Sequence, residues 1–292
     1  MESKTIDVDG LGVHYLDFGG SGEPMVLVHG LGGSAINWLA VGDRLAQTGH
    51  RVLALDLAGF GRTPVAGRKS SVKNNVALLD SFLEKVAGGP AVLVGNSMGG
   101  LISVVETADH PQRVSRLVLV DPALPGSRRR RVDLTVWMFF AFLLTPLAAE
   151  AVLRRRSRRL GPERVVARTL KVCCTDPAAV PAEIVEAHVE LVRQRQSMPW
   201  SERALVQAAR SLLALLARGR FDSRLDSVGC PVLLVHGRDD RVVPVETSLV
   251  VAQGRPRWRV EVLDGVGHVP MLEAPDLFLK FVQDFLSSAR AA

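Results

Sequence analysis

Short runs of apolar residues alternate with longer amphipathic stretches along most of this chain. A run without polar interruption is typical of a strand covered on both faces, as in a parallel sheet. Valine- and leucine-rich runs of this kind lie at 25–28, 52–55, 91–94, 117–120, 232–235 and 260–263. The stretches at 37–48, 72–86 and 101–108 have the length and periodicity of helices. This alternation predicts an α/β fold with a mostly parallel, doubly wound sheet.

The first residues have a different pattern. Residues 4–9 and 11–18 flank the dipeptide Asp9-Gly10, which readily supplies the positive φ of a tight hairpin turn. We therefore expect an antiparallel hairpin at the edge of the sheet.

The strand pattern stops after Asp121-Pro122 and resumes at Pro231-Val232. The interval between them has helical character throughout, and breaks near Pro125-Gly126 and at residues 219–222 mark its ends. The sequence therefore predicts an α/β core made of residues 1–126 and 223–292, with a helical cap inserted at 127–222.

Ser97 lies in the segment Gly95-Asn96-Ser97-Met98-Gly99, between a predicted strand and a predicted helix. This G-x-S-x-G pattern in this context is typical of a nucleophile elbow. Glycines on either side of the serine allow the chain to turn sharply and present the hydroxyl to a reactant. We therefore expect Ser97 to act as a nucleophile.

A serine hydroxyl needs a base at neutral pH, and histidine has a suitable pKa. The expected chain order after an elbow serine is acid, then histidine. Of the seven histidines, only His268, in a glycine-flanked loop, follows the pair Asp239-Asp240. His268 is therefore the predicted base.

The acid orients the histidine and stabilises its charged form. Asp240 is the predicted acid because it follows the strand at 232–235, and sites in α/β proteins lie at the carboxyl ends of strands. Asp239 and Asp121, which also ends an apolar strand, stay open as alternatives.

Acyl transfer also requires two hydrogen-bond donors aimed at the developing oxyanion. We assign these to the backbone N–H groups of Met98, which begins the helix after the elbow, and Leu31, in a glycine-rich loop after a strand. The neighbouring His29 is interpreted as a structural residue that hydrogen-bonds this loop. The loop lacks the G-x-G-x-x-G and Walker patterns of phosphate-binding loops.

Five ordered motifs closely resemble those of the α/β-hydrolase superfamily: His29-Gly30, residues 56–63 from Asp56 to Thr63, the elbow, His236-Gly237 with Asp239-Asp240, and Gly267-His268. The resemblance covers nearly the whole chain outside the cap. It implies an eight-stranded, mostly parallel sheet with a catalytic triad and no cofactor or metal. We interpret residues 56–63 as a structural turn.

Within this superfamily, a serine at the elbow argues against epoxide or haloalkane chemistry. The elbow resembles that of carbon–carbon hydrolases of aromatic ring-cleavage products, but those enzymes typically carry tryptophan after the base, where this chain has Val269. The first expectation is therefore a serine hydrolase for a lipophilic ester. Carbon–carbon hydrolysis and a non-catalytic ligand-binding protein are the alternatives.

Residues 134–149 contain no charged residue and lie between arginine clusters at 128–131 and 154–159. A helix of this length covers about 24 Å, too short to span a bilayer, and Pro146 is expected to kink or divide it. This segment predicts a cap helix that lines the pocket, with peripheral contact to an anionic membrane as a further hypothesis.

Composition adds few constraints. The chain has 292 residues, a formal net charge of +6 and three cysteines without a disulfide or zinc pattern. The N-terminus lacks a secretory signal pattern. These features favour a cytoplasmic location. The arginine clusters have no aromatic stacking motif beside them, so nucleic acid is not an expected partner.

Overall fold

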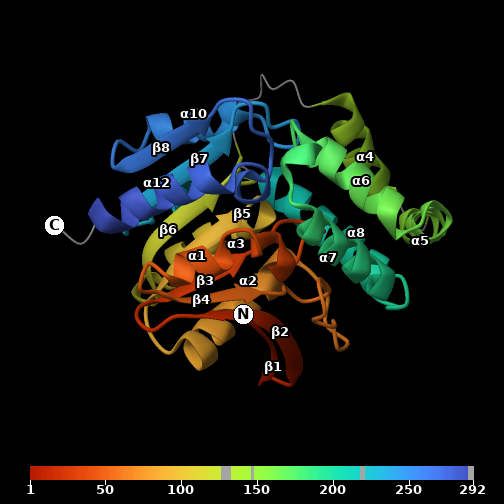
Figure 1. Cartoon of the computed structure of the whole chain (residues 1–292), viewed down its shortest axis with the longest axis horizontal. Helices are drawn as coiled ribbons and strands as arrows, with labels where there is room; N and C mark the ends of the chain where they lie inside the picture. The colour runs from red at the N-terminus through yellow and green to blue at the C-terminus, as the bar shows by residue number, and fades with distance from the viewer. Residues whose placement is uncertain (126–132, 146–147, 218–220, 289–292) are drawn as a thin grey trace.

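The structure is a computed structural model that describes residues 1–125, 133–145, 148–217 and 221–288. An eight-stranded sheet forms its centre, in the order β1-β2-β4-β3-β5-β6-β7-β8 (Figure 1). The strands are β1 (Glu2–Val8), β2 (Leu11–Gly19), β3 (Pro24–Val28), β4 (Arg51–Leu55), β5 (Ala91–Asn96), β6 (Val114–Val120), β7 (Val232–Gly237) and β8 (Trp258–Leu263).

All strands from β4 to β8 in this order pair in parallel. β1 and β2 pair antiparallel, and β2 joins β4 antiparallel. The hairpin turn has positive φ at both Asp9 (53°) and Gly10 (77°). The predicted α/β fold and its antiparallel edge are thus confirmed.

Helices cover both faces of the sheet, as the continuous apolar strands require. Along β3, Val26 and Val28 pack in the layer that contains α2 and α3, whereas Met25 and Leu27 pack in the layer that contains α1 and α12. The helices of the core are α1 (Gly42–Ala46), α2 (Val72–Phe82), α3 (Met98–Asp109), α9 (Asp222–Asp226), α10 (Val245–Gln253), α11 (Pro270–Glu273) and α12 (Pro275–Ser288).

Between β6 and α9, five helices of the described residues gather at one end of the molecule (Figure 1). They are α4 (Leu134–Leu144), α5 (Ala149–Leu160), α6 (Pro162–Cys173), α7 (Ala182–Arg195) and α8 (Ser201–Ala217). The described residues of this interval form no strand. Gly126 and residues 218–220 lie outside the described residues, so the cap boundaries at 126/127 and 222/223 stay a prediction.

One predicted helix differs in the structure. The stretch 37–48 is not one helix but a 3-10 turn, η1 (Ala35–Trp38), followed by the short α1. The apolar stretch 134–149 is divided, as expected, since α4 ends at Leu144 and α5 begins at Ala149. Pro146 and the arginine cluster 128–131 lie outside the described residues. No helix in the described ranges has the length and apolarity to cross a membrane.

Candidate active site

Ser97 lies on a sharp turn between β5 and α3. Its backbone has φ 54° and ψ −117°, a conformation that costs a non-glycine residue about 1–3 kcal/mol and is concentrated at functional sites. Hydrogen bonds hold this conformation: the Ser97 N–H donates to the Val120 carbonyl (2.9 Å), and the Ser97 carbonyl accepts from the Ala123 N–H (3.0 Å). The turn is therefore fixed by the neighbouring β6 and the residues after it.

The glycines around Ser97 are required by close backbone packing. A Cβ on Gly99 would lie 2.3 Å from the Val28 carbonyl oxygen, and one on Gly95 would lie 2.6 Å from the Gly99 oxygen. A Cβ on Gly30 would lie 3.0 Å from the Ser97 Cβ. The elbow thus packs directly against the end of β3 and the loop after it.

His268 and Asp240 are hydrogen-bonded through His268 Nδ1 and Asp240 Oδ2, which are 2.7 Å apart. The other carboxylate oxygen of Asp240 accepts from the N–H groups of Val242 (2.7 Å) and Val243 (3.0 Å). Burial alone would raise the pKa of Asp240, but the attraction of His268 and the hydrogen bonds from His236 and His268 outweigh burial and lower it. Asp240 is therefore a charged carboxylate that fixes the orientation of the imidazole ring.

The structure separates the three aspartates that the sequence left open. Asp239 is exposed, and its carboxylate accepts from the Gly265 N–H (3.1 Å). Asp121 is buried, and its Oδ1 accepts from the Gly237 N–H (2.9 Å). Burial raises the pKa of Asp121 well above its usual range. Of the three, Asp240 is the one that bonds to His268.

His236 is a buried residue of this site to which the sequence analysis assigned no role. Its Nδ1 lies 2.8 Å from Ser248 Oγ and its Nε2 lies 2.9 Å from the Val243 carbonyl oxygen. The same Nε2 is 3.3 Å from Asp240 Oδ2 and 3.5 Å from Asp121 Oδ1. Burial would lower its pKa, but the attraction of both carboxylates raises it. His236 therefore contacts both carboxylates and helps to stabilise the negative charge of Asp240.

The loop after β3 carries Leu31, and its Gly30 packs against Ser97. His29 anchors this loop: its Nδ1–H donates to the Gly30 carbonyl (2.7 Å), and its Nε2 accepts from the Leu57 N–H (3.1 Å). Burial lowers the pKa of His29 to about 4, so the ring is neutral near pH 7. These contacts agree with a structural role for His29.

Asp56 organises the neighbouring turn in the same way. One carboxylate oxygen accepts from the Ala35 N–H (2.7 Å), and the other accepts from the Arg62 N–H (2.8 Å) and lies 2.6 Å from His14 Nδ1. All of these contacts are hydrogen bonds between Asp56 and other groups of the protein itself. They agree with the interpretation of residues 56–63 as a structural turn.

Two polar residues that the sequence analysis missed tie the His268 loop to its surroundings. The Asn96 side-chain amide donates to the carbonyls of His268 (3.1 Å) and Val120 (3.2 Å). Glu273 accepts from the Gly267 N–H (2.7 Å) and from the Asp176 N–H (2.6 Å), which belongs to the segment after α6.

The cap contacts the candidate base directly. The His268 N–H donates to the carbonyl of Cys173 at the end of α6 (2.6 Å), and Arg241 donates to the carbonyl of Cys174 (3.3 Å). A Cβ on Gly267 would lie 2.4 Å from the same Cys173 oxygen. The end of α6 therefore packs against the loops that carry both the acid and the base.

The opposite side of the site is apolar. Leu31 packs against a cluster built from α4, α5 and α8, formed by Leu143, Ala149, Val206 and Ala209. Ser97 and His268 are both buried. The candidate oxyanion loop therefore contacts hydrocarbon side chains of the cap.

Two groups of side chains in the described part of the chain have metal-ligand spacing. Ligand atoms of Asp121, Asp240 and His268 lie within 4.8 Å of one another, but a cation there would compete with the hydrogen bond between Asp240 and His268. The second group is Asp80, Glu106 and His110, where the Arg113 guanidinium already lies 2.5 Å from Asp80. Existing partners therefore occupy ligand atoms in both groups.

Comparison with known proteins identifies relatives over nearly the full length. The sequence model of the α/β hydrolase fold matches residues 23–275. A 2-hydroxy-6-oxononadienedioate/2-hydroxy-6-oxononatrienedioate hydrolase from Burkholderia vietnamiensis is 28% identical over 97% of this chain and 95% of its own. A protein of the same name from Escherichia coli O81 is 27% identical over 98% and 96%.

Solved structures also resemble this chain over most of its length. A bacterial membrane phospholipase A has a TM-score of 0.77 and 27% identity, with 100% of this chain and 87% of that chain covered. A meta-cleavage product hydrolase from Pseudomonas fluorescens IP01 has a TM-score of 0.77 and 24% identity, with 98% of both chains covered.

Proposed function

The chain belongs to the α/β-hydrolase fold family, and we propose that it is a hydrolase in which Ser97, His268 and Asp240 form the catalytic triad. The Asp240 carboxylate accepts from His268 Nδ1, which leaves Nε2 unprotonated and able to act as a base. A loop histidine with one nitrogen already committed to a buried carboxylate is suited to proton transfer. This contact supports the assignment of roles.

In the proposed mechanism Ser97 Oγ attacks a substrate carbonyl while His268 Nε2 takes its proton. The negative charge that develops on the carbonyl oxygen is stabilised by the N–H groups of Leu31 and Met98. Met98 is the first residue of α3, where backbone N–H groups lack helical partners and the helix dipole favours negative charge. His268 then returns the proton to the leaving group, and water hydrolyses the acyl-enzyme.

For the substrate we favour a 2-hydroxy-6-oxodienoate, cleaved at the carbon–carbon bond beside the 6-oxo group. The observation that carries this choice is the activity for which relatives that align over nearly the whole chain are named, such as the B. vietnamiensis hydrolase. The substrate first isomerises to its 2-oxo form, in which the 2-hydroxyl has lost a proton and C5 has gained one. When the C5–C6 bond then breaks, its electron pair passes through the remaining double bond to the 2-oxo oxygen, and the 6-acyl group stays on Ser97. The 2-oxo oxygen takes a proton and water hydrolyses the acyl-enzyme, so the overall reaction consumes one water.

The 6-substituent we propose is apolar. The relatives are named for dioates, which carry a second carboxylate, whereas the cap cluster against Leu31 is made of leucine, alanine and valine. Such a surface cannot compensate the desolvation of a carboxylate. An aryl or alkyl group at this position fits it instead.

Ester hydrolysis is the second candidate, favoured by Val269 in the position after the base and by the same apolar cap. It uses the same first step, but the bond that breaks is carbon–oxygen and the leaving alkoxide takes the proton from His268. A lipophilic ester would place its acyl chain along α4 and α8.

The test compares two substrate classes on one protein. Purified wild type is assayed with 2-hydroxy-6-oxo-6-phenylhexa-2,4-dienoate, followed by loss of the dienoate absorbance, and with p-nitrophenyl esters of graded acyl length. Fluorophosphonate labelling reports on the serine independently of substrate. Ser97→Ala is the test variant, and Ser287→Ala, an exposed serine on α12, is the matched control.

We expect turnover and labelling by wild type and Ser287→Ala, and loss of both in Ser97→Ala. A higher kcat/KM for the dienoate supports carbon–carbon hydrolysis, and a higher value for the long-chain esters supports the second candidate. Labelling or turnover that survives in Ser97→Ala refutes the proposed nucleophile. No turnover of either class by labelled wild type refutes both substrate proposals.

A further inference from the structure

Helix α4 exposes an unusual amount of apolar surface. Of the nine large hydrophobic residues that are exposed in the described part of the chain, five lie on this one helix. Leu134, Trp137, Met138 and Leu144 have exposed fractions between 53% and 69%. Val136 and Leu143 are buried against the cap. Because residues three and four apart share a helix face, α4 has an inner and an outer apolar row.

Helix α5 presents a concentrated positive charge. It contains five arginines and one glutamate. Arg154 is paired with Glu202 (3.3 Å). The other four arginines of α5 are exposed and form no ion pair within the described residues. These four are Arg155, Arg156, Arg158 and Arg159. Four unpaired cations on three turns of helix leave a strong local field for an anionic partner.

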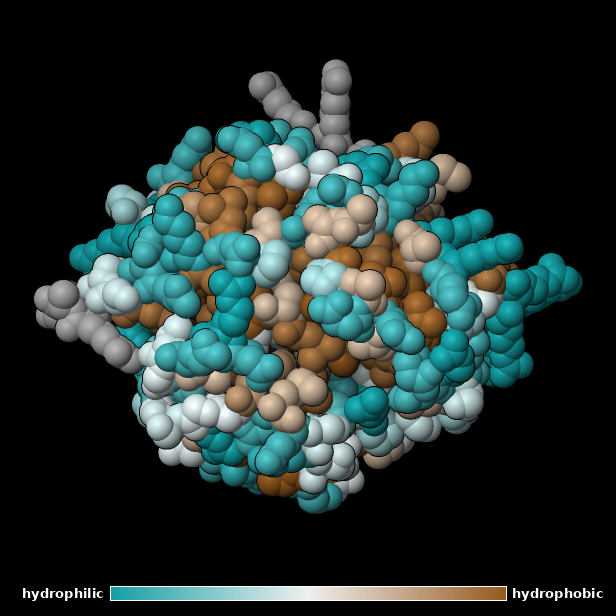
Figure 2. Space-filling model, in the orientation of Figure 1, coloured by the Kyte–Doolittle hydropathy of each residue, from teal (hydrophilic) through white to brown (hydrophobic). Residues whose placement is uncertain are grey.

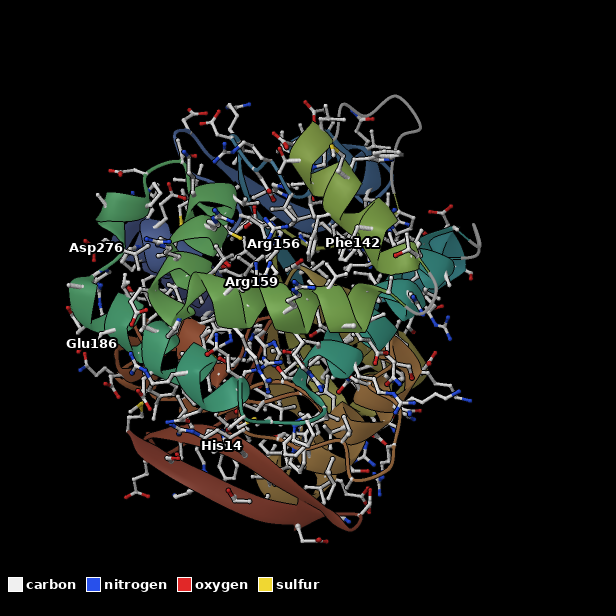
Figure 3. The ribbon with its side chains drawn as sticks, turned by 90° about the vertical axis from the view of Figure 1, so that its right-hand side faces the viewer. His14, Phe142, Arg156, Arg159, Glu186 and Asp276 are labelled. Atoms are coloured by element: carbon white, nitrogen blue, oxygen red, sulfur yellow. The ribbon has the colours of Figure 1, made fainter. Side chains whose placement is uncertain are left out.

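The two helices lie on the same end of the molecule and contact each other. Figure 3, which faces this end, shows α5 with Arg156 and Arg159 beside α4 with Phe142. In Figure 2, hydrophobic side chains project where α4 lies and hydrophilic ones extend where α5 lies. Their inner faces share one cluster, built around Leu143 and Ala149. The apolar row and the arginines therefore lie on neighbouring helices at one end of the molecule, and we call this surface the α4–α5 face.

From this arrangement we propose that the α4–α5 face docks on the surface of a bilayer that contains anionic lipid. The outer row of α4 enters the boundary between headgroups and acyl chains, and the arginines of α5 contact the headgroups. An apolar row beside a basic one is the arrangement that suits an interfacial helix. Eleven residues give α4 a length of about 16 Å, enough to lie in the interface and too little to cross it.

The space between the arginines fits the same partner. An open hollow of about 640 Å³ on α5 is lined by Glu150, Ala151 and four arginines, among them Arg155 and Arg159. Guanidinium groups bind phosphate oxygens in pairs of parallel hydrogen bonds. A phosphodiester headgroup therefore meets its preferred donors there, whereas an apolar protein surface would leave these cations buried and unpaired.

Docking on a bilayer does not depend on the proposed reaction, but it would affect how a substrate reaches Ser97. The inner row of α4 packs over Leu31, which belongs to the candidate oxyanion loop. A lipophilic substrate dissolved in the bilayer would reach the serine along apolar side chains without crossing water.

The experiment measures binding of the full chain, as Ser97→Ala, to phosphatidylglycerol vesicles and to phosphatidylcholine vesicles by flotation. Using the Ser97→Ala protein separates this proposal from the proposed function, since binding requires no turnover. Trp137→Ser tests the apolar row, and Arg155→Gln with Arg159→Gln tests the charges. Matched controls are Val250→Ser, an exposed apolar residue on α10, and Arg257→Gln, an exposed arginine before β8.

We expect binding to phosphatidylglycerol that weakens with added salt, and little binding to phosphatidylcholine. One basic residue contributes about fivefold to such binding, so the double arginine variant loses about 25-fold. Trp137→Ser loses about tenfold, and the controls stay within twofold. Tryptophan emission of the parent protein shifts to the blue on binding, and this shift is absent in Trp137→Phe.

Absence of flotation at every anionic fraction overturns the proposal. Equal losses in the test variants and the controls do the same, because they exclude a defined face. A dimer by light scattering that Trp137→Ser dissociates assigns the outer row of α4 to a second copy of the chain, and this result also overturns the proposal.

Discussion

Replacing Asp240 by asparagine gives the sharpest test of the candidate triad. Asp240 has one carboxylate oxygen on two backbone N–H groups, of Val242 and Val243, and the other on His268 Nδ1. An asparagine has one acceptor end and one donor end. The asparagine oxygen can therefore accept either from the two backbone N–H groups or from His268 Nδ1, but not from both.

The energetics of the two orientations decide the outcome. With its NH2 toward Val242 and Val243, the asparagine would leave two N–H donors without their partner, of which the buried one, on Val243, costs about 1–3 kcal/mol. With its oxygen on those donors, its NH2 faces His268 Nδ1. The second orientation is therefore favoured, and His268 must then carry its proton on Nε2. The ring can no longer take the Ser97 proton.

The expected result is a fall of about 10³–10⁴ in kcat, which corresponds to about 4–5.5 kcal/mol in the activation free energy. Initial rates with a p-nitrophenyl ester or the dienoate measure it, and the rate constant of fluorophosphonate labelling gives a second measure that needs no substrate. Thermal unfolding shows whether the variant is folded.

Asp121→Asn is the matched control for this experiment. Burial raises the pKa of Asp121 well above its usual range, and asparagine keeps the size of this side chain and one acceptor oxygen. Its Oδ1 contact with the Gly237 N–H survives the change, and we expect activity within about tenfold of wild type. A folded Asp240→Asn variant that retains activity within tenfold of wild type, or a thousandfold loss in Asp121→Asn, would refute the assignment of the acid.

Three further predictions concern stability and positioning. Burial lowers the pKa of His29 to about 4, below an unfolded value of about 6.5, so the folded state binds fewer protons in this range. The free energy of unfolding should therefore fall by about 3 kcal/mol as the pH falls from 6.5 to 4, and urea titrations should show a smaller fall for His29→Gln. Ser97→Gly should abolish turnover yet raise the free energy of unfolding by about 1 kcal/mol, because glycine tolerates φ 54°; lower stability than wild type would contradict the strain. Glu273→Gln should lose one of two buried hydrogen bonds and lower both the free energy of unfolding, by about 1–3 kcal/mol, and kcat; an unchanged kcat would show that Glu273 does not position His268.

The parts of the fold that the sequence predicts well are those set by local pattern. The buried strands are continuous apolar runs, and the hairpin turn needs only the positive φ of Asp9-Gly10. The helix at 37–48 was wrong because its start is set from elsewhere: Asp56 accepts the Ala35 N–H across 21 residues. The apolar periodicity of the segment contains no sign of that contact.

The same distinction applies to the candidate site. Ser97 and His268 carry local signatures, but adjacent aspartates do not, and only the turn after β7 shows that Asp240 points inward and Asp239 outward. Glu273 and Asn96 were missed because their partners, Asp176 and His268, are 97 and 172 residues away. A polar residue whose role is to join distant loops has no motif of its own.

The two ends of the cap are attached to the core by different forces, and this difference predicts where a substrate enters. The end of α6 is held by hydrogen bonds to the base loop, from His268 to Cys173 and through Glu273 to Asp176. Displacing that end would break buried hydrogen bonds, including charge-assisted ones of about 1.5–3 kcal/mol each, and would move the base itself. Helix α4 meets the core through apolar contacts with Leu31, and those contacts can be exchanged for contacts with an apolar ligand at little cost. We therefore expect lipophilic substrates to enter on the α4 side, while the hydrogen bonds on the α6 side keep His268 in a fixed position relative to Ser97.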